Sequence, residues 1–194
     1  MLEAEIAAAE TALAAVLADT PAGILTTLPG VAVVRASNYG AGIGDPARFA
    51  NSAGAYRSAG LVPTSYESAR RARPGQHISR EGSVELRQAI IELGRGLSQH
   101  DPDFAAYRHR LLDAKKPAGV AAVAVGHRAH RLAFAMLVSQ QAYDPEKWAK
   151  SVAAGKTVMA KAQRAHQNDV TCPLPDTSVI ERGDRHNTAT RARG

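Results

Sequence analysis

The amino-acid sequence predicts a mainly α-helical domain, and two patterns lead to this fold class. Apolar residues recur at helical spacing from the start of the chain, at Leu2, Ile6, Ala9 and Leu13. The dipeptide Asp-Pro occurs three times. It is typical of helix starts, because the Asp side chain caps free N–H groups while Pro fits the first helical position. We therefore expect a compact helical domain with an irregular basic loop and a flexible C-terminal tail.

Each expected helix follows from a start signal or an apolar period. In chain order we expect a helix over 2–18, a short helix over 21–27, a helix over 31–42, short helices near 46–50 and 52–59, an irregular basic loop over 62–80, and helices over 83–99, 102–115, 118–141 and about 145–154. Thr20-Pro21 ends the first helix and starts the second, and the Asp-Pro starts are Asp45-Pro46, Asp101-Pro102 and Asp144-Pro145. The basic loop has room for a small hairpin.

The domain limits follow from where the periodicity begins and ends. We expect a helical arm over 1–20, a helical domain over 21–160 and a disordered tail over 161–194, because the tail is polar and lacks an apolar period. Ser83 is a good N-cap for the helix that follows it, and Glu85 in the first turn complements the helix dipole.

The charge and the cysteine content of the chain indicate its class of binding partner and its cellular compartment. The chain has 194 residues and a formal net charge of +6, which favours nucleic acid or an acidic membrane surface as partner. Its one cysteine, Cys172, excludes a disulfide framework and indicates a reducing cytoplasm. The longest apolar run, 118–125, is too short to span a bilayer, so we expect no membrane partner.

A serine stands next to a cluster of arginines in the basic loop. Ser68 is followed by Arg70, Arg71 and Arg73, and Arg80 lies further along the same loop. A hydroxyl among guanidinium groups suits chemistry on a phosphate backbone, or the holding of one. The alternative is an arginine-rich loop that only positions nucleic acid, and both interpretations give the same partner. No Gly-x-Ser-x-Gly elbow occurs, so an ester-hydrolase triad is unsupported.

Two further motifs have a functional and a structural interpretation. Leu28-Pro29-Gly30-Val31 joins two predicted helices, and N–H groups at such a helix start bind phosphate in a helix-hairpin-helix clamp; the alternative is an ordinary turn. His127, His130 and Arg131 share a face of the long helix, which indicates a polar packing face or a phosphate contact more than a metal site. The expected nucleic-acid-binding residues are Gly30, Val31, Arg70, Arg71, Arg73, His77, Arg80, Arg87 and Arg131.

Several short segments keep the order and spacing of one known family. They are Leu25-Thr26-Thr27-Leu28-Pro29-Gly30-Val31, Ile43-Gly44-Asp45-Pro46-Ala47-Arg48-Phe49, Ala59-Gly60-Leu61-Val62-Pro63, Ser68, and Ile78-Ser79-Arg80-Glu81-Gly82-Ser83 with Leu86-Arg87. Over roughly residues 1–148 the chain resembles the C-terminal domain of the insertion-sequence transposases related to the Piv DNA invertase, which are DEDD-type recombinases guided by a bridge RNA. The resemblance implies that Ser68 is the nucleophile on DNA, that DNA and a structured guide RNA are partners, and that the protein works as an oligomer.

The resemblance also implies parts that this chain lacks or changes. In the family a separate N-terminal RuvC-like domain holds Mg²⁺ on four acidic residues, and this chain begins inside the arm that follows that domain. No such set of carboxylates is visible here, so no cofactor is expected within the chain. Ala69 and Ala32 stand where the family has Gly, and Ser83 stands where Asn is common.

These observations lead to one expected function and two alternatives. We expect a transposase or recombinase domain that binds DNA and guide RNA and supplies a serine nucleophile, inactive when isolated from the RuvC-like domain. The first alternative is a catalytically incomplete nucleic-acid-binding remnant that associates with full-length transposases. The second, a helical clamp of the DNA-repair type, depends only on the Pro-Gly turn.

Overall fold

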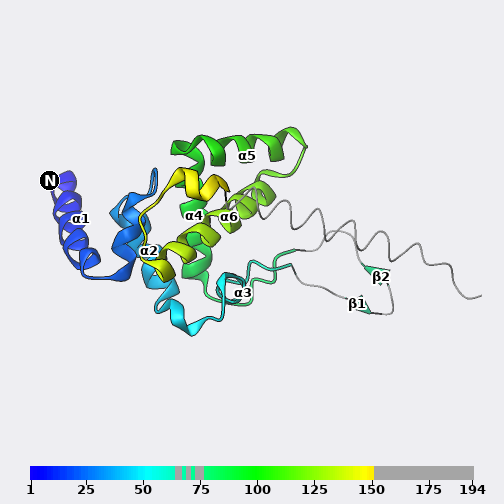
Figure 1. Cartoon of the computed structure of the whole chain (residues 1–194), viewed down its shortest axis with the longest axis horizontal. Coiled ribbons are helices and arrows are strands. Elements are labelled where there is room, and N and C mark those ends of the chain that lie inside the picture. Colours follow the sequence, from blue (N-terminus) through cyan, green and yellow to red (C-terminus); the bar gives the residue numbers. More distant parts are fainter. Residues whose placement is uncertain (64–66, 69–70, 73–76, 151–194) are drawn as a thin grey trace, which may run out of the picture. The chain divides into compact units, whose positions relative to one another are not determined.

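The computed structural model describes residues 1–63, 67–68, 71–72 and 77–150 (Figure 1). The chain divides into two compact units, Met1–Trp148 and Ala149–Gly194, and nearly all described residues belong to the first. The predicted disordered tail over 161–194 lies outside the described residues.

Helices make up most of the first unit, which confirms the predicted fold class. They are α1 (Leu2–Ala18), η1 (Pro21–Thr27), α2 (Val33–Ile43), η2 (Pro46–Arg48), α3 (Ser52–Ser58), α4 (Val84–His100), α5 (Pro102–Asp113) and α6 (Ala118–Ser139), with two short strands, β1 (Glu67–Ser68) and β2 (Arg71–Ala72). Residues 145–150 are also helical, and the rest of the helix expected to 154 lies outside the described residues. The segments expected as short helices over 21–27 and 46–50 are 3₁₀ helices.

Side-chain caps start the helices where the sequence predicted them. Asp45 Oδ1 accepts a hydrogen bond from the Ala47 N–H at 2.9 Å, and Asp101 Oδ1 accepts from the Asp103 and Phe104 N–H groups at 3.0 and 3.1 Å. Asp144 Oδ1 likewise accepts from the N–H groups of residues 146 and 147. Ser83 Oγ accepts from the Leu86 N–H at 3.0 Å. All four predicted caps are therefore confirmed.

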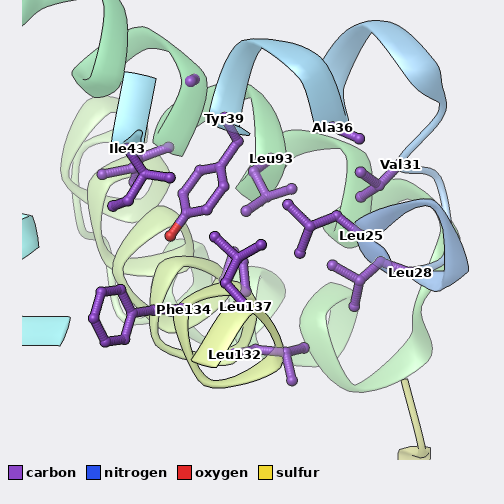
Figure 2. Close-up of a cluster of buried hydrophobic side chains, with 14 of the residues drawn as sticks. Leu25, Leu28, Val31, Ala36, Tyr39, Ile43, Leu93, Leu132, Phe134 and Leu137 are labelled. Atoms are coloured by element: carbon purple, nitrogen blue, oxygen red, sulfur yellow. The ribbon is translucent and has the colours of Figure 1, made fainter. Parts of the chain in front are cut away.

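The core lies where α4 packs against α2, α5 and α6 (Figure 2). Tyr39, Ile43 and Leu93 are all but inaccessible to solvent. Helices α4 and α6 approach closely at Gly94, where a Cβ atom would lie 2.8 Å from the Gly126 Cα atom. Glycine on both helices therefore allows their backbones to meet.

One buried polar cluster links α2, α3 and α6 through hydrogen bonds. His130 on α6 is fully buried, and its Nε2 lies 2.8 Å from the Ser52 carbonyl oxygen at the start of α3. Because a carbonyl can only accept, Nε2 carries the proton, and the Tyr39 hydroxyl of α2 donates to His130 Nδ1 at 2.9 Å. Burial is the main cause that lowers the pKa of His130 to about 4, so the ring is neutral.

The segment after α6 is held by Tyr143. Its hydroxyl donates to Asp101 Oδ2 at 2.8 Å, and its backbone N–H donates to Thr27 Oγ1 at 3.0 Å. The same Asp101 caps α5 with its other oxygen, so one carboxylate joins the end of the unit to the start of α5.

Helix α1 keeps most of its apolar side chains exposed. Leu2, Ile6 and Val16 are 69%, 50% and 65% exposed, and Leu17 near the C-terminal end is buried. The predicted helix is present, and it packs on the described residues through its C-terminal half, whereas the distinct apolar face expected for it is weak. No helix in the described part of the chain is by itself long and apolar enough to cross a membrane, although the bent pair of α1 and η1 passes that test jointly.

Candidate nucleic-acid interface

The loop between α3 and α4 is held at its base by a stem, made of residues 58–63 and 78–83. Pro63 and Ile78 form an antiparallel bridge. The Ser79 N–H donates to the Val62 carbonyl at 2.9 Å, and the Arg80 N–H donates to the Gly60 carbonyl at 3.0 Å. The Ser83 N–H donates to the Ser58 carbonyl at 2.9 Å, so the stem joins the end of α3 to the start of α4.

Arg87 of α4 donates hydrogen bonds to three backbone carbonyls of this stem. Its Nε donates to the Ala59 carbonyl at 3.0 Å, and its Nη2 donates to the carbonyls of Arg80 and Gly82 at 3.0 and 3.4 Å. From the sequence we expected Arg87 to contact nucleic acid. The structure commits two of its three guanidinium nitrogens to loop carbonyls, so its visible role is to position the stem.

Gly82 allows the backbones of the two sides of the stem to approach each other closely. Its φ is +149°, and a Cβ atom there would lie 2.2 Å from the Ser58 carbonyl oxygen and 2.9 Å from the Gly60 backbone nitrogen. Only glycine fits both the backbone conformation and the space.

Replacing Gly82 with alanine is therefore expected to displace the stem. We expect the free energy of unfolding to fall by roughly 2 kcal/mol, measured by urea denaturation, because a strained backbone and a steric clash combine. Gly119→Ala is the matched control, because Gly119 lies in the first turn of α6 with open space around its Cβ position. Equal stability of the two variants would contradict a structural role for this close approach.

Beyond the stem, β1 and β2 pair as a small antiparallel hairpin. The register pairs Glu67 with Ala72 and Ser68 with Arg71. The hairpin that the sequence left possible is thus present, and the serine and one of the three clustered arginines stand opposite each other on it. Arg70 and Arg73 lie outside the described residues.

Two other predicted residues are exposed near this loop. His77 lies at the start of the returning side, and Arg80 lies within the stem. Arg80 has a φ of +56°, which is uncommon for a residue with a Cβ atom. Its N–H and carbonyl are both bonded to the stem and to Arg87, so the surrounding bonds hold this conformation.

Arg131 is exposed on α6, the helix that packs against α3. One turn earlier on α6, the His127 ring lies 4.4 Å from the Tyr56 ring of α3, measured between centroids. Desolvation, and then the charge of Arg131, lower the pKa of His127. The polar packing face expected on this helix is confirmed by His130, and Arg131 remains available at the surface.

The Pro-Gly turn packs against the C-terminal end of α4. Gly30 has a φ of +70°, and a Cβ atom there would lie 2.2 Å from His100 Cδ2. Val31 is buried, and its N–H donates to the Leu28 carbonyl at 3.1 Å. The Val31 N–H is therefore bonded within the turn, and phosphate binding by the N–H groups at the start of α2 stays a prediction.

Two polar side chains, Arg128 and His130, have partners that the sequence did not predict. Arg128 lies over the rings of Phe104, Tyr107 and Trp148, with its guanidinium carbon 5.1 to 6.0 Å from their centroids. His130 was singled out, but not its bond to Tyr39. The available signal was local: His130 is followed by Leu132 and Ala133 on the buried face of α6, where a lone histidine needs partners.

Acidic and other metal-binding side chains do not gather in the described part of the chain. No group of three or more His, Cys, Asp or Glu residues there is arranged to hold a metal ion. The described residues therefore do not fit a Mg²⁺ site of their own.

The described geometry is a helical domain in which the loop between α3 and α4 has a hydrogen-bonded stem at its base and a short antiparallel hairpin further along the chain. Comparison with known families is more specific. Residues 22–109 match the model of the Transposase IS116/IS110/IS902 family. The matched segment runs from η1 into α5 and includes the stem and the hairpin. No curated protein matches the chain.

Proposed function

We propose that this chain is the serine-bearing, nucleic-acid-binding part of an insertion-sequence transposase. One juxtaposition supports the proposal: Ser68 pairs with Arg71 in a small hairpin of the loop between α3 and α4, inside the segment that matches the transposase family. A nucleophile on a phosphate backbone needs nearby cations, and the pairing of Ser68 with Arg71 suits this need.

The proposed reaction is a transesterification. Ser68 Oγ attacks the scissile phosphorus, an O–P bond to serine forms, and the bond from phosphorus to the 3′ oxygen breaks. The serine proton ends on the leaving 3′ oxygen, so a free 3′-OH and a phosphoserine link result. The link conserves the bond energy for rejoining. Arg71 and Arg80, with Arg70 and Arg73, balance the charge that develops on the phosphoryl oxygens.

The remaining partners are proposed from the resemblance. DNA is the substrate and a structured RNA is the guide, and the active form is an oligomer with a RuvC-like domain. That domain would supply Mg²⁺, and no step above is assigned to a metal held by this chain.

The alternative function is nucleic-acid binding without catalysis. The lack of a metal-binding cluster among the described residues favours it for the isolated chain. The two functions differ in one result, because both require nucleic-acid affinity and only the first produces a covalent adduct.

The binding common to both functions is tested by a salt titration. We expect the full chain to bind labelled duplex DNA and structured RNA with affinity that falls steeply as salt rises, because counterions are released from the phosphates. Arg71→Gln and Arg80→Gln should each lower the slope of log affinity against log salt by about 1. Arg110→Gln on the exposed side of α5 removes the same charge and serves as the control. Binding that is absent at low salt, or indifferent to salt, would contradict the proposal.

A further inference from the structure

A second candidate site lies away from the hairpin, among α4, α5 and α6. These three helices line a cavity of about 340 Å³. Its lining includes the apolar residues Ile91, Ala122 and Val125, which we term the floor. Gly94 also lines the cavity, and it lies in close contact with Gly126 of α6.

The rim of the cavity is polar and carries positive charge. It consists of Arg95, Ser98 and Gln99 from α4 and Arg108 from α5. No Asp or Glu side chain is among the residues that line it. Two arginine residues therefore line one cavity that has no acidic residue in its wall.

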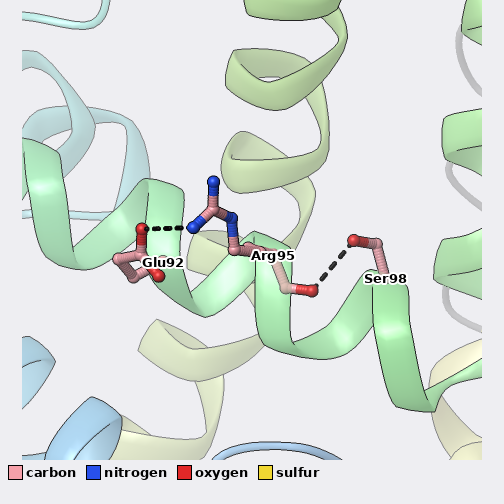
Figure 3. Close-up of polar contacts among 3 residues, drawn as sticks. All are labelled: Glu92, Arg95 and Ser98. Atoms are coloured by element: carbon pink, nitrogen blue, oxygen red, sulfur yellow. Dashed lines mark hydrogen bonds and ion pairs between the residues drawn. The ribbon is translucent and has the colours of Figure 1, made fainter.

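The two arginines differ in their ion-pair partners, and Figure 3 shows the contacts of Arg95. Arg95 Nη1 lies 3.5 Å from Glu92 Oε1, and the Arg95 side chain is 65% exposed, so this ion pair is weak and open to competition. Arg108 is exposed and has no ion-pair partner among the described residues. The Ser98 hydroxyl donates to the Arg95 carbonyl at 2.9 Å, which leaves its oxygen as an acceptor.

We propose that this cavity binds one unpaired nucleotide of a nucleic-acid strand. The phosphate lies between Arg95 and Arg108, and the base lies against the floor formed by Ile91, Ala122 and Val125. A free phosphate would bind the guanidinium groups and leave the apolar floor exposed to water. A nucleotide uses both, and the Gln99 amide can both donate to and accept from a base edge. A paired base cannot enter, because its edge is covered by its partner.

This inference rests on the proposed function, since it assumes that the strand is one the hairpin also handles. It adds a separate contact on different helices. Two linked contacts raise the overall affinity for one strand above that of either alone.

The first test is fluorescence anisotropy of the full chain with a labelled single-stranded oligonucleotide. Arg108→Gln is expected to weaken binding about tenfold, as for the loss of a charged hydrogen bond. Arg110→Gln removes the same charge from the same helix two residues away and should leave the affinity within about twofold. Glu92→Gln should strengthen binding, because it frees Arg95. Equal affinities of Arg108→Gln and Arg110→Gln would overturn the proposal.

The second test separates a nucleotide from a bare phosphate. Ala122→Leu fills the floor without changing charge and is expected to weaken oligonucleotide binding, with an unchanged thermal midpoint showing that the fold is intact. AMP should displace the oligonucleotide at a concentration about tenfold below that of inorganic phosphate. If AMP and phosphate compete equally and Ala122→Leu binds like the parent chain, the cavity does not bind a nucleotide.

The two proposals fail in different ways. Loss of binding in Arg71→Gln with no change in Arg108→Gln would leave the proposed function standing and overturn only the cavity. If the oligonucleotide does not bind at all, titration calorimetry with AMP reads the cavity alone: binding that Arg108→Gln abolishes supports the cavity, and no heat of binding overturns it.

Discussion

Replacing Ser68 with alanine is expected to abolish the covalent protein–DNA adduct completely. The expected effect is all-or-none, because without its Oγ the residue cannot form a bond to phosphorus. Nucleic-acid affinity should remain nearly unchanged, since one neutral hydroxyl adds little to binding dominated by charge. The reaction is assayed on a denaturing gel with labelled DNA, with a RuvC-like domain supplied by fusion or in trans together with Mg²⁺ and a guide RNA.

Two controls make the Ser68 result specific. Ser79→Ala changes another serine of the same loop, whose hydroxyl accepts a bond from the Glu81 N–H at 3.4 Å, and it should keep the adduct. The chain without a RuvC-like domain should form little or no adduct. An adduct that persists in Ser68→Ala means that another residue is the nucleophile.

Replacing His130 with alanine is expected to cause the largest loss of stability among single substitutions in the described core. The change removes a fully buried ring and leaves the Tyr39 hydroxyl and the Ser52 carbonyl without their partner. The cavity and the unpaired polar groups together cost roughly 4 kcal/mol. That is a large part of the 5 to 15 kcal/mol, roughly, that stabilises a typical domain.

Chemical denaturation of three variants separates the contributions. Tyr39→Phe keeps the ring packing and removes one hydroxyl, so its loss should be only about 1 to 2 kcal/mol. His109→Ala, an exposed histidine on α5, should change the free energy of unfolding by less than about 0.5 kcal/mol. A loss in His130→Ala no greater than in His109→Ala would show that the cluster does not fasten the helices.

The same histidine predicts a dependence of stability on pH. The pKa of His130 is about 4 in the folded chain against its ordinary value of 6.5, so the unfolded chain binds more protons between these values. The contribution to stability is therefore complete above pH 6.5 and is lost as the pH falls toward 4, by about 3 kcal/mol. The groups that face the ring are Tyr39, Tyr56, His127 and the Ser52 carbonyl.

Comparing the parent chain with His130→Ala isolates this effect from the titration of carboxylates. The free energy of unfolding should fall more steeply in the parent chain as the pH is lowered through this range. Parallel curves for the two proteins would mean that His130 titrates normally in the folded chain.

Local signals in the sequence predicted the helix starts, and the reason is physical. A cap acts over two or three residues, so Asp45, Asp101 and Ser83 predict their bonds without knowledge of the fold. The hairpin could also be predicted from the sequence, because only a few residues separate its two strands. The 3₁₀ geometry of η1 and η2 was not predicted, because such short segments have too little period to distinguish helix types.

Long-range contacts decided the roles that the sequence could not. Arg87 bonds to the Ala59 carbonyl 28 positions away, and from the sequence alone it was expected to reach a nucleic acid. His130 meets Tyr39 at a separation of 91 positions. The cavity with Arg95 and Arg108 was missed for the same reason, because only the packing of α4, α5 and α6 brings these arginines into one cavity.

We propose that Ser68 is the residue that becomes linked to DNA. Mass spectrometry of peptides from the reconstituted reaction tests it most directly, after protease digestion of the covalent adduct. The account predicts that the nucleotide mass is attached to Ser68 in the peptide that contains the hairpin. A nucleotide found on Ser65, Ser79 or any other residue would contradict the account.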